Sequence, residues 1–184
     1  MRSDFKVVLD ACVLANFAVV DLLLRLAEKP RLFTPLWSKD IRVETSRTQI
    51  ESLNWPPEIS RSFKAKMQEA FPESMIEGHE YLIERCTNDV KDRHVLACAV
   101  HGKSELILTF NIKDFKEKDL SPWKVSAKHP QDYLLTLFDL EPLHVIQQLG
   151  AIAEKRKCAL EDHLTELGRF LPKFSRRLLD ELNP

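Results

Sequence analysis

Apolar and polar residues follow one another along the chain in a pattern that predicts a strand and then a helix. Residues Phe5 to Leu9 form a short apolar run, which is typical of a buried parallel strand. From Ala11 to Glu28 the apolar positions recur at helical spacing, and Pro30 stops the pattern. Asp10 therefore lies where the first strand ends and the first helix begins.

The middle of the chain continues this alternation. Ser38 is expected to cap the second helix, and Gly102 is expected to stand just beyond the end of a later one. Because strands and helices alternate, the sequence predicts an α/β fold with a parallel sheet flanked by helices, whose ligands bind at the carboxyl ends of the strands. The further helices are predicted at Trp37 to Leu53, Glu58 to Phe71, Gly78 to Arg85 and Val90 to His101, and the further strands at Leu106 to Phe110 and Lys124 to Ala127.

The pattern changes after His129 and Pro130, where only helical spacing remains. We therefore divide the chain into an α/β domain at residues 1–128 and a C-terminal, all-helical extension at residues 129–184. The extension carries more apolar residues than one thin helical face requires. We expect its first helix to pack on the α/β domain, and we expect the segment from Leu160 onward to leave part of its apolar face for a partner.

Composition and charge narrow the class of protein. Apolar residues make up 44% and charged residues 30% of the chain, which is the balance of a globular protein. No apolar run is long enough to span a membrane and no secretory signal is visible, so we expect a cytoplasmic protein with no membrane contact. The formal net charge of −1 lacks the basic excess of a non-specific nucleic-acid binder, so any nucleic-acid binding must be local.

The four cysteines lie far apart in sequence and form no CxxC pair, which favours neither a zinc site nor a disulfide framework. We interpret them as reduced thiols. Cys12 and Cys98 fall inside apolar segments, where a free cysteine behaves as a small hydrophobic residue.

Acidic residues recur at the edges of the predicted elements. Asp10 and Asp114 follow strands, Asp89 and Asp92 stand at a helix start, and Glu44 lies on a helix between them. Hard divalent cations such as Mg²⁺ are held by a few carboxylates and retained waters. Taken singly, each acid is also explained as a helix cap or as a solvated surface charge, and both interpretations stay open at this point.

Three segments carry a resemblance that bears on this choice. Residues Val7 to Leu14, Asp89 to Ala99 and Leu108 to Phe115 resemble, in order and separation, the three signature segments of PIN-domain nucleases, most closely those of the bacterial VapC-like toxin type. The resemblance covers about residues 5 to 128, with a helical tail similar to that of a longer-tailed subset. It implies a metal-dependent endoribonuclease that is the toxin of a toxin-antitoxin pair.

The resemblance also implies roles for individual residues. The catalytic acids would be Asp10, Glu44, Asp92 and Asp114, with Mg²⁺ or Mn²⁺ held by Asp10, Asp92 and Asp114. The supporting residues would be Asp89, Thr109 and Asn111, and the side chains beside the acids that could hold RNA phosphates are Lys91, Arg93, Lys113 and Lys116. The implied partners are an RNA substrate and a cognate antitoxin protein, and a homodimer is allowed.

Other interpretations compete with this one. A phosphatase of the haloacid-dehalogenase kind would need a second aspartate where this chain has Cys12, and a phospho-receiver pattern finds no match. A PIN fold that binds protein or RNA without cleaving it is the main alternative, and DNA cleavage is a second one. His94 and His101 stand two helical turns apart, roughly 10 Å along the axis, which is too far to hold one metal together.

Overall fold

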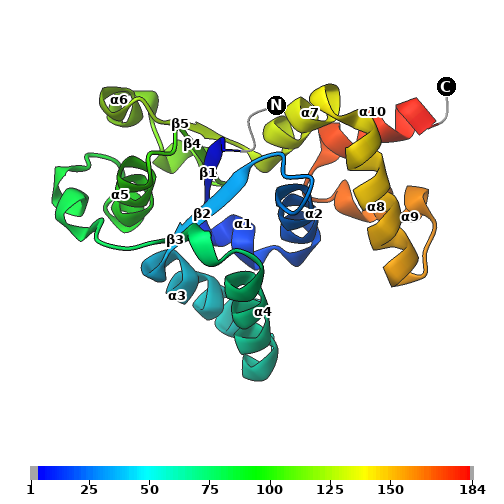
Figure 1. Cartoon of the computed structure of the whole chain (residues 1–184), viewed down its shortest axis with the longest axis horizontal. Coiled ribbons are helices and arrows are strands. Elements are labelled where there is room, and N and C mark those ends of the chain that lie inside the picture. The colour runs from blue at the N-terminus through cyan, green and yellow to red at the C-terminus, as the bar shows by residue number, and fades with distance from the viewer. Residues whose placement is uncertain (1–3, 183–184) are drawn as a thin grey trace.

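The computed structural model describes residues 4–182, and its centre is one parallel sheet (Figure 1). The strands lie in the order β3-β2-β1-β4-β5. This arrangement confirms the α/β class predicted from the sequence. The strands are β1 (Lys6–Leu9), β2 (Thr34–Ser38), β3 (Met75–Ile76), β4 (Leu106–Leu108) and β5 (Ser126–Lys128).

Strand β1 is the central strand, and its register sets where Asp10 stands. Val8 pairs with Leu36 of β2 on one side and with Ile107 of β4 on the other. Val7, Val8 and Leu9 are fully buried, as expected of a parallel strand that is covered on both faces. Since all strands run in one direction, the residues that follow β1 and β4 emerge at the same edge of the sheet.

Helices cover both faces of the sheet (Figure 1). Helix α5 contacts β1, β2 and β4, whereas α2 lies on the other side and contacts β2. Helices α3 and α4 pack on each other beyond the carboxyl edge of the sheet. The helices up to β5 are α1 (Ala11–Ala15), α2 (Phe17–Ala27), α3 (Lys39–Arg47), α4 (Pro57–Ala70), α5 (Arg93–Gly102) and α6 (Glu117–Leu120), with a π-helical turn at Thr48–Ser52 and 3₁₀ turns at Pro72–Ser74, Glu80–Arg85, Val90–Asp92, Ile112–Asp114 and Ser121–Trp123.

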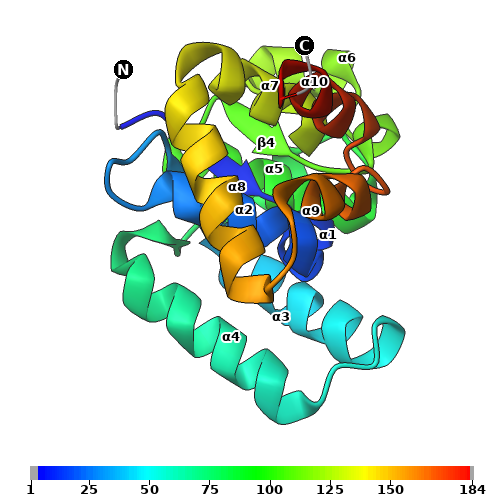
Figure 2. The same cartoon turned by 90° about the vertical axis from the view of Figure 1, so that its right-hand side faces the viewer.

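The C-terminal extension consists of four helices. They are α7 (Pro130–Leu140), α8 (Pro142–Arg156), α9 (Leu160–Leu167) and α10 (Pro172–Leu182). Figure 2 shows α8 and α9 lying over α2 and α1, and α8 contacts α2. The expected boundary at residue 128 falls at the end of β5, and His129 caps α7 through its ring nitrogen.

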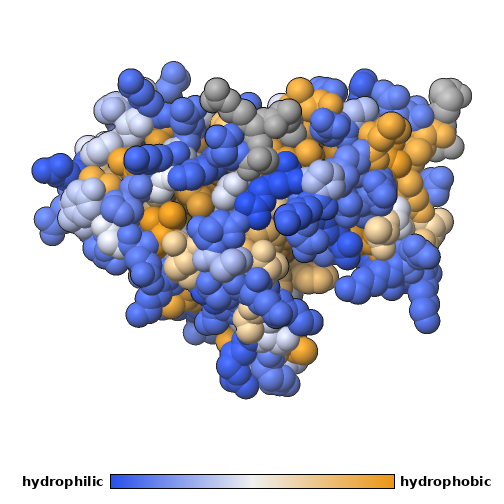
Figure 3. Space-filling view, in the orientation of Figure 1, coloured by the Kyte–Doolittle hydropathy of each residue, from blue (hydrophilic) through white to orange (hydrophobic). Residues whose placement is uncertain are grey.

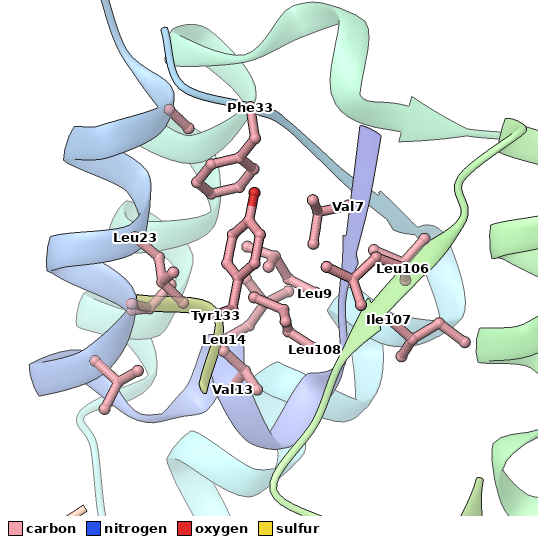
Figure 4. Packing of buried hydrophobic residues seen from close by; sticks show 14 of the residues in the cluster. Val7, Leu9, Val13, Leu14, Leu23, Phe33, Leu106, Ile107, Leu108 and Tyr133 are labelled. Atoms are coloured by element: carbon pink, nitrogen blue, oxygen red, sulfur yellow. The ribbon is translucent and has the colours of Figure 1, made fainter. Parts of the chain in front are cut away.

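The hydrophobic core runs without a break from the sheet into this extension (Figure 4). Tyr133 of α7 meets the ring of Phe33 edge to face, with 5.5 Å between the ring centroids. In Figure 4 Tyr133 stands among Leu9, Leu108 and other strand residues. Full burial of a side chain of this size stabilises the fold by about 1.5–3 kcal/mol, so α7 contributes directly to the stability of the sheet.

Most of the apolar face of the segment from Leu160 onward is buried within the chain, but Phe170 is 43% exposed, so the expected use of part of this face by a partner stays a prediction. Leu164, Leu171 and Phe174 are fully buried, and Leu178 is almost so. Helix α10 packs on α7 and α9, and Gln131 of α7 accepts a hydrogen bond from the backbone N–H of Lys173 at 2.7 Å. The four helices therefore cover most of one another's apolar faces.

Two strands were missed in the sequence. The helix predicted from Trp37 begins only at Lys39, because Thr34–Ser38 forms β2, in which all five residues are buried. A strand that is buried on both faces shows no alternation, so its pattern cannot be told from that of a buried helix. Ser38 does cap the helix as predicted, since its hydroxyl accepts a hydrogen bond from the N–H of Ile41 at 3.3 Å. The two-residue strand β3 is too short to leave a pattern.

Two helix ends also differ from expectation. The helix predicted over residues 11–28 is interrupted at Asn16, whose side chain accepts a hydrogen bond from the N–H of Val19 and caps α2. Gly102 is the last residue of α5 and not the residue beyond it, because Lys103 takes the left-handed conformation with φ of 56°. Gly102 is also closely packed: an added Cβ would lie 3.0 Å from Leu36 Cδ1, so that side chain would have to shift by a few tenths of an ångström.

The surface in the orientation of Figure 3 is largely hydrophilic, with apolar patches scattered over it. None of the helices described within residues 4–182 combines the length and the apolar character that crossing a bilayer needs.

Candidate active site

Asp10 is the first residue after β1, and its side chain is held in place from several sides. One carboxylate oxygen, Oδ1, accepts a hydrogen bond from the N–H of Ala11 at 2.7 Å. The other, Oδ2, accepts one from the hydroxyl of Thr109 at 2.7 Å and a weaker one from the thiol of Cys12 at 3.2 Å. Asp10 is only 3% exposed, and burial raises the pKa of its carboxyl above the ordinary value despite these donors.

Thr109 positions Asp10 from the neighbouring strand. Its side chain is fully buried just beyond β4, and its hydroxyl accepts a hydrogen bond from the N–H of Asn111 at 3.0 Å. The same hydroxyl donates its proton to Asp10 Oδ2, because an ionised carboxylate can only accept. Thr109 therefore lies where the sequence predicted a supporting hydroxyl.

Cys12 has a role here that the sequence did not indicate. Besides its contact with Asp10, its sulfur accepts a hydrogen bond from the N–H of Phe110 at 3.4 Å. Burial, followed by the charge of Asp10, raises the pKa of the Cys12 thiol to about 12. The thiol therefore stays protonated and acts as a donor to the carboxylate.

Asp92 provides the clearest sign that the acids converge. It stands at the start of α5, yet its side chain makes no capping hydrogen bond, so the cap interpretation does not account for it. Burial raises the pKa of Asp92 to about 6, and the negative charges of Asp10, Asp114, Glu44 and Asp89 raise it further in that order. All four of these acids are thus close enough to repel a charge on Asp92.

Glu44 lies on α3 and reaches the site with a histidine beside it. His94 Nε2 lies 3.3 Å from Glu44 Oε2. Burial alone would lower the pKa of His94, but the hydrogen bond and charge of Glu44 outweigh it and raise the pKa above its ordinary value. His94 could not be selected from the sequence, because its partner lies 50 residues away on another helix.

The remaining candidates lie around this cluster. Asp89 accepts a hydrogen bond from the N–H of Lys91 at 3.1 Å and so caps the turn that leads to Asp92. Asp114 is half-buried at the end of its 3₁₀ turn, and Asn111 is exposed at the start of that turn. Among the predicted phosphate-binding residues, Lys91, Lys113 and Lys116 are exposed and Arg93 is half-buried, with its Nε donating to the carbonyl of Asn88.

The donor set fits a hard divalent cation. Carboxylate oxygens are what Mg²⁺ and Mn²⁺ prefer, and a cation among them would relieve the repulsion that raises the pKa of Asp92. Within residues 4–182, however, no three acidic, histidine or cysteine side chains are already arranged to hold one ion. Mg²⁺ usually binds one or two carboxylates and keeps several waters, so it does not require such a preformed group.

Comparison with known proteins gives one clear relative. Over 113 residues the chain is 37% identical to "Putative ribonuclease VapC50" of Mycobacterium tuberculosis, and the match covers 58% of this chain and 67% of the relative. No family model matches the chain, and no solved structure matches it. On the strength of this identity, together with the five-stranded parallel sheet and its flanking helices, the chain belongs to the VapC-like family of PIN-domain nucleases.

Proposed function

We propose that this chain is a Mg²⁺- or Mn²⁺-dependent endoribonuclease and the toxin of a toxin-antitoxin pair. The observation that supports the proposal is the raised pKa of Asp92, which is due first to burial and then to the negative charges of Asp10, Asp114, Glu44 and Asp89. Such an arrangement destabilises the protein without a cation, so it has little structural use. The name of the relative, which describes a ribonuclease, supports the same activity.

In this proposal Asp10, Asp92 and Asp114 hold the cation, and Glu44 is the fourth acid. A bound divalent cation would stabilise charge on the scissile phosphate and make an attacking water more acidic. The protein's own contribution is positioning: Thr109 and Cys12 fix the carboxylate of Asp10, and Asp89 fixes the turn before Asp92. His94 positions Glu44 through the contact between its Nε2 and Glu44 Oε2.

Substrate binding would use the basic residues beside the acids. Lys91, Lys113 and Lys116 are exposed and free to reach flanking phosphates, and Arg93 stands next to Asp92. Phosphodiester chemistry alone does not distinguish RNA from DNA, so the choice of RNA is supported by the relative's name only. A cytoplasmic setting is part of the proposal and agrees with four free cysteines.

A PIN-fold module that binds RNA or protein without cleaving it is the second candidate. The observation in its favour is that no three donors within residues 4–182 are preassembled around one ion. In both cases a cognate antitoxin protein is the expected partner, and self-association into a homodimer is compatible with the fold.

The test is an assay of the purified chain against total RNA with Mg²⁺, with Mn²⁺ and with EDTA, followed by mapping of the new ends. We expect discrete cleavage with either cation, none in EDTA, and no cleavage of single-stranded DNA of the same sequence. Equal cleavage of the DNA would change the substrate class. Binding of RNA without cleavage under all metal conditions would favour the non-catalytic module.

A further inference from the structure

A second candidate site lies away from the acidic cluster. Residues of α2, α8 and α9 and of the turn after α9 line an open cavity of about 280 Å³. None of the four acids of the candidate active site lines it. The lining residues are Phe17, Ala18, Asp21, Ile152, Arg156, His163, Glu166, Leu167, Arg169 and Phe170.

His163 lines this cavity and has one ring nitrogen without a hydrogen-bond partner among the described residues. The Nη1 of Arg156 lies 2.8 Å from His163 Nδ1, and a guanidinium group can only donate, so Nδ1 must be the acceptor. Burial and the charge of Arg156 lower the pKa of His163, so the ring is neutral and carries its proton on Nε2. His163 is 2% exposed, and among the described residues Nε2 finds no hydrogen-bond partner.

Aromatic side chains stand at the same cavity. Phe17 is 52% exposed and Phe170 is 43% exposed, which is unusual for rings of this size. Phe17 also meets Trp55 and Phe63 edge to face, with centroid distances of 6.0 and 6.3 Å. The cavity thus opens beside a strip of aromatic rings that leads toward α4.

Most charged side chains that line the cavity form ion pairs, and Arg169 is the exception. Arg156 forms an ion pair with Glu166, and Asp21 is paired with Arg25 at 3.2 Å. Arg169 is exposed in the turn beside Phe170 and takes part in no ion pair within the described part of the chain. The site therefore combines apolar walls, stackable rings, one buried donor and one exposed cation.

We propose that this cavity receives an unstacked nucleobase of single-stranded RNA, stacked on Phe170 or Phe17, with His163 Nε2 donating to the base and Arg169 contacting the adjacent phosphate. A cavity of this size is below the usual range for drug-sized ligands, about 300–1,000 Å³, and suits one base. The proposal rests on the proposed function and names a recognition subsite for its substrate.

The position along the chain is consistent with this use. Phe17 is separated from Asp10 only by α1, which has five residues, and Asn16. A helix of that length spans about 8 Å, so Phe17 follows Asp10 closely along the chain.

The test measures binding separately from cleavage. A short, fluorescently labelled single-stranded RNA is titrated with the protein in EDTA, where cleavage is prevented, for wild type, Phe170→Ala, Arg169→Gln and His163→Phe. Loss of one base-aromatic stack should weaken binding roughly five- to 150-fold, which corresponds to about 1–3 kcal/mol. Leu143→Ala is the matched control, because Leu143 is an exposed apolar residue of the same extension, 83% exposed on α8. An abasic substitution at one position of the RNA should abolish the difference between wild type and Phe170→Ala.

The outcomes separate the two proposals. Unchanged RNA affinity in both Phe170→Ala and Arg169→Gln, which replace exposed residues and should fold, would overturn the base site even if cleavage is normal. Weaker RNA binding in these variants, together with no metal-dependent cleavage in wild type, would support the base site and defeat the nuclease. Variants that bind RNA normally but lose affinity for an apolar peptide would show that the cavity takes a protein side chain, which also overturns the proposal.

Discussion

Replacing Asp92 with asparagine should stabilise the metal-free protein at neutral pH. Asp92 carries a carboxyl whose pKa is raised from 3.8 to about 6 by burial and by four neighbouring acids. An acid whose pKa is raised in the folded state binds its proton more tightly when folded, so its ionisation costs stability. Asparagine keeps the size of the side chain and removes the charge, and no capping hydrogen bond is lost.

The sign and magnitude follow from the two pKa values. Below about pH 3.8 the Asp92 carboxyl is protonated in both the folded and the unfolded protein, so it costs no stability. The loss of folding free energy grows between about pH 3.8 and pH 6 and is fully present above about pH 6. The difference of about 2 pH units corresponds to at most about 3 kcal/mol. Because Asp92 is only half-buried, solvent screening reduces the expected gain to about 1–2 kcal/mol, or about 2–8 °C in Tm.

The assay is thermal unfolding of wild type and Asp92→Asn in EDTA, at several pH values from 4 to 8. We expect the Tm difference to be near zero at the lowest pH and to reach its full value above pH 6. Asp139→Asn, at an exposed position on α7, is the control and should show no such rise. A variant that is no more stable than wild type at pH 8 would refute the idea that the acids converge on Asp92. Added Mn²⁺ should stabilise wild type more than the variant.

Three further predictions test other parts of the structure. Thr109→Val removes the hydroxyl that holds Asp10 at 2.7 Å, so metal-dependent cleavage should fall about 10- to 100-fold while circular dichroism stays unchanged; an unaffected rate would remove Thr109 from the site. Expression of the wild-type chain should arrest bacterial growth and Asp114→Asn should relieve the arrest, whereas equal growth at equal protein levels would argue against the toxin role. Leu178→Ala in α10 should lower the free energy of unfolding by about 2–5 kcal/mol, because that side chain is 1% exposed; a cost below 1 kcal/mol would mean that α10 packs loosely.

The positions of site residues could be predicted from the sequence where they directly follow strands of a parallel sheet. Asp10 follows a buried strand and Thr109 follows its neighbour, and parallel strands bring both to one edge of the sheet. Asp92 could be assigned to the same cluster only through the family resemblance. The residues around it do not indicate that the start of α5 lies at that edge of the sheet. The structure adds that the pKa of Asp92 is raised, first by burial and then by the charges of the neighbouring acids.

Side chains whose roles depend on distant partners could not be assigned from the sequence. Cys12 looked like a small hydrophobic residue, but its thiol faces Asp10 and the loop after β4. His94 looked like an ordinary histidine because Glu44 is remote in sequence. The apolar faces of α9 and α10 suggested a partner, since hydrophobic periodicity reveals that a face is covered but not by which segment.

The most direct test of the account measures cleavage of one defined RNA as a function of Mn²⁺ concentration, for wild type and for Asp10→Asn, after circular dichroism has shown that both are folded. Asp10 is chosen because it is the most deeply buried acid of the cluster and is held by Ala11, Thr109 and Cys12. The account predicts cleavage by wild type that rises with Mn²⁺ and disappears in EDTA, with no cleavage by the variant at any concentration. Cleavage by wild type in EDTA, or equal rates for the two proteins at saturating Mn²⁺, would contradict it.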